Sequence, residues 1–128
     1  MKALLDTHSF LWWNMGDKQL SPVAYEFISD SRNEIYLSAA SAWEIAIKTA
    51  RARLTLPQPP NEYVASRMSA FHFLPLPIWI SHALHVFKLP EIHQDPFDRM
   101  LIAQSQLENI PLLTSDLIIR EYDVQVIW

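Results

Sequence analysis

The sequence contains no cysteine and only one glycine. Without cysteine there are no disulfide bonds, no thiolate nucleophile and no zinc site built on cysteine ligands. The chain is 50% apolar, 12% aromatic and only 19% charged, which excludes low complexity and intrinsic disorder. A length of 128 residues fits one domain of ordinary size, so we expect a single domain over residues 1–128.

Long apolar runs and an excess of positive charge are also missing. Asp6 and His8 interrupt the apolar start before a signal-peptide core can form, and no segment reaches the roughly 18 apolar residues of a membrane span. We therefore expect a soluble cytoplasmic protein with no membrane partner. The net charge of −4 argues against a broad basic face for nucleic acid, whereas carboxylates around a divalent metal ion would account for that sign and still allow a phosphate substrate.

Short apolar strands alternate with helical segments along the chain. Strand patterns cover residues 2–6, 34–38, 73–77, 111–116 and 124–127. Helical patterns cover residues 10–15, 21–31, 41–50, 61–71 and 79–87, and another helix starts at residue 96. Thr7 or Ser9 is expected to cap the first helix. This alternation predicts an α/β fold of three layers, in which a short, mainly parallel sheet is flanked by helices.

Four acids stand at comparable ends of these elements. Asp6 and Asp116 end apolar strands, and Glu44 and Asp98 lie in the first turns of helices. In sheets of this kind, ligands bind beyond the carboxyl ends of the strands. We therefore expect the four carboxylates to meet at one rim of the sheet.

Each helical acid also has a purely structural interpretation. Asp95 is placed to cap the helix that contains Asp98, with Arg99 one turn later as its ion-pair partner. Acids at a helix start are favoured by the helix dipole, typically by about 0.3 to 1 kcal/mol, so Asp98 needs no ligand to explain it.

Glu44 has a similar alternative. Ser41 and Glu44 have the spacing of a capping box, and Lys48 follows Glu44 at the distance of one helical turn. The carboxylate could therefore serve only the helix in which it lies.

A cluster of carboxylates has a definite chemistry. Ionised carboxylates repel one another unless their pKa values rise or a cation joins them. Oxygen ligands without cysteine or a group of histidines favour Mg²⁺ or Mn²⁺ over Zn²⁺. Because such an ion activates water and neutralises phosphate oxygens, phosphodiester hydrolysis is the natural reaction for the site.

The order of the acid-bearing segments resembles a known family. The segments are Leu5-Asp6-Thr7-His8, Ser41-Ala42-Trp43-Glu44-Ile45-Ala46-Ile47-Lys48, Ile92-His93-Gln94-Asp95-Pro96-Phe97-Asp98-Arg99 and Leu113-Thr114-Ser115-Asp116. Over nearly the whole chain they resemble the PIN-domain ribonucleases, in particular the VapC-type toxins of bacterial toxin–antitoxin pairs. The run Asp95-Pro96-Phe97-Asp98-Arg99, with its spacing from the other segments, is the most specific part of the resemblance.

The resemblance implies a metal-dependent endoribonuclease whose one or two Mg²⁺ or Mn²⁺ ions are bound by four catalytic acids, namely Asp6, Glu44, Asp98 and Asp116. We assign the most direct ligand roles to Asp6 and Asp98, the ordering of metal-bound water to Asp116, and its activation to Glu44. Supporting roles go to three polar neighbours, which are Thr7, Ser115 and Asp95.

Basic and aromatic side chains near these acids are candidates for holding RNA. Candidates for phosphate contacts are Lys48, Arg51, Arg53 and Arg99. Arg51 and Arg53 also fit a solvated helix face. Trp43 could stack on an unpaired base or belong to the core.

The histidines are given structural roles. His82 and His85 lie one turn apart, but no third ligand stands near them, so we interpret both as ordinary side chains on a helix surface. His93 is expected to support the loop that leads to Asp95.

The same resemblance implies the partners. They are RNA, a second copy in a homodimer, and a cognate antitoxin whose C-terminal segment lies in an apolar groove. The run Phe10-Leu11-Trp12-Trp13 is the candidate wall of that groove, with plain core packing as the alternative.

Two other magnesium-dependent classes do not fit. A receiver domain needs a pair of acids after the first strand, and an aspartyl phosphatase needs Asp-x-Asp there, whereas the sequence reads Asp6-Thr7-His8. The alternative that remains open is a PIN-like module that binds RNA or a partner without catalysis.

Overall fold

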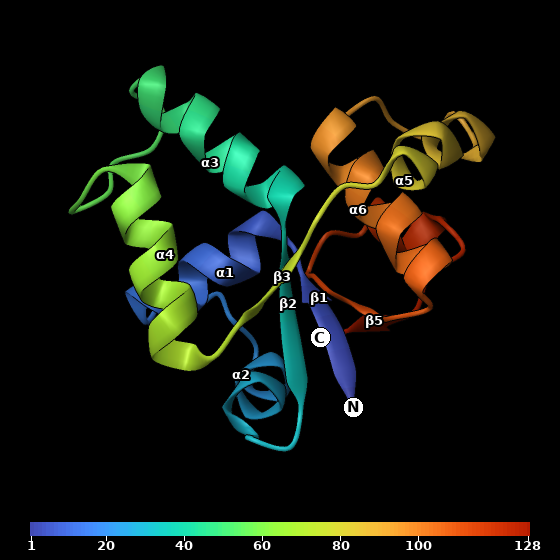
Figure 1. Cartoon of the computed structure of the whole chain (residues 1–128). Helices are drawn as coiled ribbons and strands as arrows, with labels where there is room; N and C mark the ends of the chain where they lie inside the picture. Colours follow the sequence, from blue (N-terminus) through green and yellow to red (C-terminus); the bar gives the residue numbers. More distant parts are fainter.

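The centre of the protein is a five-stranded sheet with the strand order β3-β2-β1-β4-β5 (Figure 1). The computed structural model describes residues 1–128. The strands are β1 (Lys2–Leu5), β2 (Glu34–Ser38), β3 (Leu74–Leu76), β4 (Leu112–Leu113) and β5 (Val126–Ile127). All neighbouring strands are parallel, so the prediction of a short, mainly parallel sheet is confirmed.

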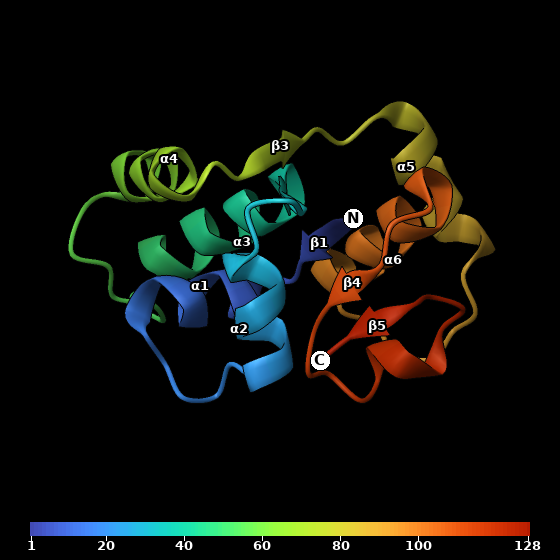
Figure 2. The same ribbon diagram turned by 90° about the horizontal axis from the view of Figure 1, so that it is seen from below.

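Helices cover both faces of this sheet (Figure 2). The helices on one face are α1 (Thr7–Met15), α2 (Pro22–Ser29), α3 (Ala39–Ala50) and α4 (Pro60–Phe71). The other face is covered by α5 (Ile80–His85), the 3-10 turn η1 (Val86–Lys88), α6 (Pro96–Glu108) and the 3-10 turn η2 (Ile119–Glu121). The predicted α/β architecture of three layers is therefore confirmed.

The core is divided into two parts by β1. Leu5 packs with Phe10 and Ile45 on the side of α1 to α4, whereas Leu4 packs with Leu101 on the side of α6. Successive side chains of a strand point to opposite faces, so a strand that is covered on both faces must be apolar at every position. Leu4 and Leu5 are both fully buried. This explains why the first strand is a continuous apolar run rather than an alternating one.

The first helix begins earlier than the sequence predicts. It starts at Thr7, and its N-cap is Asp6, whose Oδ1 accepts a hydrogen bond of 2.7 Å from the backbone N–H of Ser9. The prediction that Thr7 or Ser9 caps this helix is wrong. A carboxylate directly after the strand reaches the free N–H groups of the first turn, so no connecting loop is needed.

The third helix also starts directly after a strand. Ser38 ends β2 and caps α3, with its hydroxyl accepting a hydrogen bond of 3.0 Å from the backbone N–H of Ala40. The predicted capping box of Ser41 and Glu44 is therefore wrong. Glu44 lies in the second turn of the helix, where its carboxylate accepts a hydrogen bond from Thr7 rather than from the helix start.

His82 is not a surface side chain, although the sequence pattern predicts one. It is fully buried where α5 packs on α6, with Nε2 lying 2.9 Å from Oε1 of Glu108 and Nδ1 accepting a hydrogen bond of 3.0 Å from the backbone N–H of Trp79. His85 is half-buried and lies 2.7 Å from the side-chain oxygen of Gln106. Both imidazoles thus fasten α5 to α6. None of the helices has both the length and the apolar character that crossing a membrane requires.

Candidate active site

The carboxyl end of β1 is the point where the strand order reverses. From β1 the chain continues to β2 and β3 on one side of the sheet and to β4 and β5 on the other. A crevice forms at such a point because the connections leave in opposite directions, and ligands of α/β proteins bind there. Asp6 follows β1 directly, Ser38 ends β2, and Thr114 follows β4 directly.

Asp6 is held at this point by two donors. Its Oδ1 caps α1, and its Oδ2 accepts a hydrogen bond of 2.5 Å from the hydroxyl of Thr114. Only 5% of the residue is exposed. Burial raises the pKa of Asp6, and the hydrogen bonds from Thr114 and Ser9 oppose this rise only in part. The carboxylate is therefore a desolvated charge without a full counter-charge.

Thr114 was not among the predicted site residues. Its side chain is fully buried, donates to Asp6 and accepts a hydrogen bond of 3.0 Å from the backbone N–H of Asp116. Thr114, and not the predicted Ser115, therefore joins the two strand-end acids. Its position directly after the apolar run of β4, which matches the position of Asp6 after β1, is the sequence signal that identifies it.

Asp98 lies in the first turn of α6, where Asp95 is the N-cap. One carboxylate oxygen of Asp95 accepts hydrogen bonds from the backbone N–H groups of Phe97 and Asp98, at 2.9 and 3.0 Å. Burial, followed by the negative charges of Asp95 and Asp116, raises the pKa of Asp98 to about 6, whereas a hydrogen bond from His93 lowers it. Because the negative charge of Asp116 contributes to this rise, the acid that follows β4 and the acid in α6 lie near enough to interact electrostatically.

Glu44 reaches the same edge from α3. The hydroxyl of Thr7 donates a hydrogen bond of 2.6 Å to its Oε1, and Nζ of Lys48 lies 2.5 Å from its Oε2. The predicted alternative, an ion pair one turn along the helix, is thus present. Thr7 follows Asp6 in the chain, so this hydrogen bond also fixes Glu44 beside the end of β1.

A ring contact closes the arrangement. The rings of Trp43 and Phe97 meet edge to face with their centroids 5.4 Å apart, which joins the start of α3 to the start of α6. Trp43 precedes Glu44, and Phe97 precedes Asp98. Together with the hydrogen bonds of Thr7 and Thr114, this contact brings the four acid-bearing segments to one edge of the sheet.

The donor set fits a hard divalent cation in its chemistry. The candidate ligands are oxygens only. Burial raises the pKa of Asp6, and burial together with the charges of Asp95 and Asp116 raises that of Asp98, a cost that a bound cation would relieve. No three His, Asp or Glu side chains already lie close enough to form a metal-binding group. The carboxylates instead face protein donors, such as Thr114 for Asp6 and His93 for Asp98.

Arg99 does not face the site, and the prediction that it contacts RNA is wrong. The residue is only 8% exposed. Its Nη1 donates hydrogen bonds of 2.8 Å to the carbonyl oxygen of Pro90 and 3.0 Å to the hydroxyl of Tyr122. The predicted ion pair with Asp95 is absent, because the guanidinium satisfies carbonyl groups of the loop before α6 instead.

Other basic and aromatic candidates remain on the surface. Trp43 is 61% exposed, so the alternative that it belongs to the core is wrong. Arg51 and Arg53 are exposed just beyond the end of α3. Arg53 and Lys48 line a cavity of about 240 Å³, together with Trp12. Cationic and aromatic groups therefore border the acids on the side of α3.

The run Phe10-Leu11-Trp12-Trp13, the candidate wall of the antitoxin groove, lies partly in the core and partly at the surface. Phe10 and Leu11 are buried in the core, which bears out the alternative of core packing for them. Trp12 and Trp13 are half-buried and line a second hollow of about 330 Å³ with Tyr25. Within the run Phe10-Leu11-Trp12-Trp13, only the two tryptophans are available to a partner.

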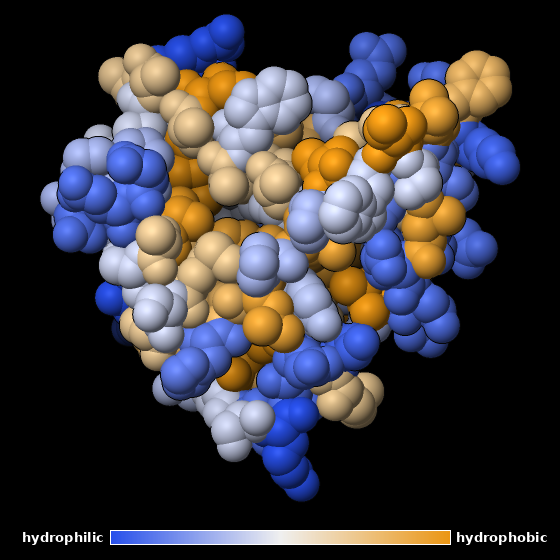
Figure 3. Space-filling model, in the orientation of Figure 1, coloured by the Kyte–Doolittle hydropathy of each residue, from blue (hydrophilic) through white to orange (hydrophobic).

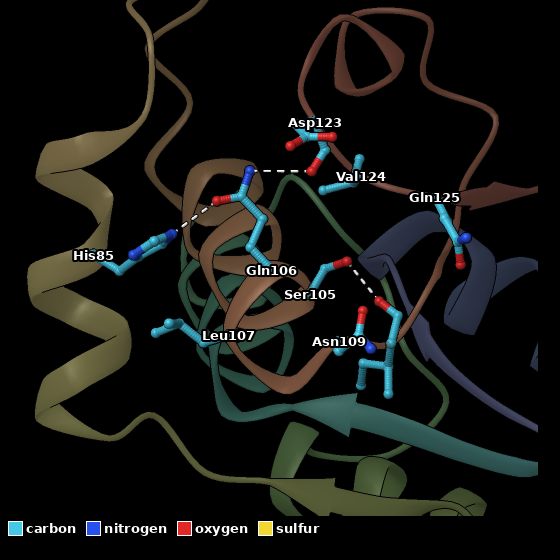
Figure 4. A pocket seen from close by; sticks show the side chains of 9 residues that line it. His85, Ser105, Gln106, Leu107, Asn109, Asp123, Val124 and Gln125 are labelled. Atoms are coloured by element: carbon cyan, nitrogen blue, oxygen red, sulfur yellow. Dashed lines mark hydrogen bonds between the residues drawn. The ribbon is translucent and has the colours of Figure 1, made fainter.

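A separate hollow of about 400 Å³ lies behind α6 and contains none of the predicted site residues (Figure 4). Its polar side chains bond to one another and to the backbone: Gln106 bridges His85 and the carbonyl oxygen of Asp123, and Ser105 donates to the carbonyl oxygen of Ile110. The hollow therefore has a structural lining rather than a set of convergent reactive groups.

Comparison with known proteins connects this geometry to a family. The family model described as PIN domain matches residues 3–125. Ribonuclease VapC16 of Mycobacterium tuberculosis is 45% identical over 58 residues, a match that spans 45% of this chain and 41% of the relative. The match thus covers less than half of that relative's length.

Solved structures resemble the chain over nearly its full length. The structure of VapBC2 from Rickettsia felis, bound to a DNA fragment from its promoter, aligns with a TM-score of 0.65 at 13% identity, covering 98% of this chain and 97% of that one. The structure of VapBC-1 from nontypeable Haemophilus influenzae aligns with a TM-score of 0.66 at 16% identity, covering 98% of this chain and 96% of that one. At these identities the likeness demonstrates a shared fold.

Proposed function

The chain belongs to the PIN-domain family, and from this premise we propose that it is a metal-dependent endoribonuclease and the toxin of a toxin–antitoxin pair. The observation that carries the proposal is the meeting of four acid-bearing segments at the switch point of the sheet, with the pKa of Asp98 raised to about 6. The local identity to a ribonuclease named VapC16 supports the reaction and the toxin class.

The four acids have different roles in the proposed reaction. Asp6, Asp98 and Asp116 would hold Mg²⁺ or Mn²⁺, and such an ion supplies Lewis acidity toward phosphate and an activated water. Glu44, oriented by Thr7, is the group that accepts the proton of the attacking water.

RNA is held by groups around these acids. Lys48 and Arg51 contribute positive charge on α3 and at its C-cap, and Lys48 also balances the charge of Glu44. Trp43, which is exposed beside Glu44, offers a ring face on which an unpaired base stacks. Single-stranded RNA is therefore the substrate class that these side chains favour.

An antitoxin is the proposed protein partner. The structural relatives are named as VapBC complexes, and the half-buried Trp12 and Trp13 line hollows suited to an apolar segment. Apolar side chains also gather on the surface over α5 and η1 (Figure 3), where Ile80, Leu84 and Phe87 are more than two-thirds exposed. The homodimer stays a prediction, and this second surface is its candidate interface.

The test is cleavage of total RNA by the purified chain, freed of any bound partner, with Mg²⁺ or Mn²⁺ and with a chelator. Asp98→Asn and Asp6→Asn remove proposed ligands, and Asp123→Asn is the matched control because this exposed acid borders the hollow behind α6. We expect discrete fragments that require the metal, Asp6 and Asp98 but not Asp123. Cleavage that survives the chelator or either ligand variant contradicts the proposal.

One observation favours a second candidate, a PIN-like module that binds without catalysis. The carboxylates are bonded to protein donors and no preformed group of three ligands exists. If the chain is such a module, it binds RNA or a partner with the same affinity after Asp98→Asn. It then cleaves no RNA in the presence of either Mg²⁺ or Mn²⁺.

A further inference from the structure

The hydroxyl of Tyr122 lies at the centre of a hydrogen-bond network beside Asp98. Tyr122 follows the 3-10 turn η2 and is only 4% exposed. Three nitrogen atoms contact its phenolic oxygen: Nη1 of Arg99 at 3.0 Å, the backbone N of His93 at 3.2 Å, and Nδ1 of His93 at 2.7 Å. No sequence pattern connects these residues with one another.

The hydrogen atoms of this network can be assigned by counting. The guanidinium of Arg99 and the backbone N–H of His93 can only donate, so they fill the two lone pairs of the phenolic oxygen. The remaining bond must then run from the phenol O–H to Nδ1 of His93. Nδ1 is consequently an acceptor, and the ring proton lies on Nε2.

The second ring nitrogen of His93 faces the candidate metal site. Nε2 lies 3.2 Å from Oδ2 of Asp98, and a proton on Nε2 makes this contact a hydrogen bond to the carboxylate. We propose that His93 is a positioning residue, fixed by Tyr122 and Arg99 in the Nε2–H tautomer, which orients the carboxylate of Asp98 toward the metal. This inference rests on the proposed function, because it assigns Asp98 as a metal ligand.

The anchoring of Arg99 explains why the network is rigid. Its guanidinium donates to the carbonyl oxygens of Pro90 and Val86 as well as to Tyr122, so the donor that contacts the phenol is itself held in place. The ring of His93 packs against that of Tyr122 with centroids 5.4 Å apart. Groups that orient a metal ligand in this way typically change metal affinity or activity by about 10- to 100-fold when they are removed.

The tautomer is tested on the metal-free chain by long-range proton–nitrogen NMR correlation of the imidazole rings. The chain has five histidines, and the His93 signals are identified by their loss in His93→Gln. We expect a protonated Nε2 and an unprotonated Nδ1 for His93, and a mixture of both tautomers in Tyr122→Phe, which keeps the ring but lacks the hydroxyl. A protonated Nδ1 in the wild-type chain overturns the inference.

The effect on the metal is tested by calorimetric titration with Mn²⁺, without RNA. We expect His93→Ala to weaken Mn²⁺ binding about tenfold. The amide of Gln can still donate to Asp98, so His93→Gln is expected to retain affinity to within about twofold. His85→Ala is the matched control, since its ring contacts Gln106 at the other side of α6. Circular dichroism verifies that each variant is folded.

The outcomes separate this inference from the proposed function. A chain that shows the expected tautomer and Mn²⁺ affinities but cleaves no RNA refutes the ribonuclease and keeps the positioning role. A chain that cleaves RNA while His93→Ala binds Mn²⁺ as tightly as the wild type refutes the positioning role alone.

Discussion

Thr114 donates a hydrogen bond of 2.5 Å to Asp6 across 108 positions of the sequence. The bond joins the carboxyl ends of β1 and β4, which are neighbours in the sheet. The same hydroxyl oxygen accepts the backbone N–H of Asp116, so one side chain fixes two of the proposed metal ligands.

Replacing Thr114 by valine keeps the shape of the side chain and removes its hydroxyl. The buried carboxylate of Asp6 then loses a donor, and we expect the free energy of unfolding to fall by about 1.5 to 3 kcal/mol, the range for hydrogen bonds to charged groups. Urea denaturation measures this change. Thr114→Ser keeps the hydroxyl, so its free energy of unfolding should fall clearly less. An equal fall in the two variants would show that packing, and not the hydrogen bond, is responsible.

The pH dependence of stability follows from Asp98. Its pKa is about 6 in the folded chain, above the ordinary aspartate value of 3.8, so the folded state binds more protons than the unfolded state between these pH values. The metal-free chain is therefore expected to lose about 2 to 3 kcal/mol of stability through this group as the pH rises from about 4 to 7, and this contribution is constant above that. The raised pKa of the buried Asp6 acts in the same direction.

Urea denaturation of the wild-type chain and of Asp98→Asn, in chelator at several pH values, measures this contribution. The difference in stability between the two chains should grow in favour of Asp98→Asn across that window. If the difference in stability between the two chains does not change with pH, the pKa of Asp98 is not raised in the folded chain.

Arg99 is expected to affect stability rather than RNA binding. In Arg99→Met the hydroxyl of Tyr122 and the carbonyl oxygen of Pro90 lose their donor, and we expect a loss of about 2 to 4 kcal/mol in the free energy of unfolding. Arg51→Met is the comparison: this exposed residue should leave stability within about 0.5 kcal/mol and weaken RNA binding at low salt. If Arg99→Met instead weakens RNA binding and leaves stability unchanged, Arg99 belongs to the RNA-binding surface.

Trp43 is expected to contribute to the binding of single-stranded RNA. Truncation in Trp43→Ala removes the exposed ring beside the acids and should weaken binding by about 1 to 3 kcal/mol, the usual range for stacking on one base. The measurement is fluorescence anisotropy of a labelled RNA in an Asp98→Asn background, which prevents cleavage.

Trp79→Ala provides the control for this measurement. Trp79 is 57% exposed, and it caps α5, whose His82 contacts Glu108 at the end of α6 opposite Asp98. Glu108 is ten residues beyond Asp98, or about 15 Å along the helix. Equal losses in the two variants would mean that the effect of Trp43 is not specific to the site.

Local rules predicted the elements because their signals lie within a few residues. Asp95 and Pro96 mark the start of α6, and Ser21 and Pro22 mark the start of α2, as observed. The same rules placed the start of α3 too late, since a capping box at Ser41 looks complete in the sequence. Only the sheet reveals that Ser38 ends a strand and caps the helix at once.

Side chains with several possible partners were the ones that the sequence assigned wrongly. Arg99 has Asp95 within one turn, but in the fold it lies beside Tyr122 and the carbonyl groups of a buried loop. His82 looks like a surface histidine until α6 covers it. For such residues the partner is chosen by long-range packing, because buried donors and acceptors must be satisfied wherever the fold places them.

The amino-acid sequence alone predicts the α/β fold class, the parallel sheet and the positions of the acids at the ends of strands and helices. Those features depend on periodicity, capping and apolar runs, which are local. The contacts of Thr114 with Asp6, of Thr7 with Glu44 and of His93 with Asp98 became visible only in the folded chain. Each of these contacts joins segments whose approach is fixed by the order of the strands, and no local pattern encodes that order.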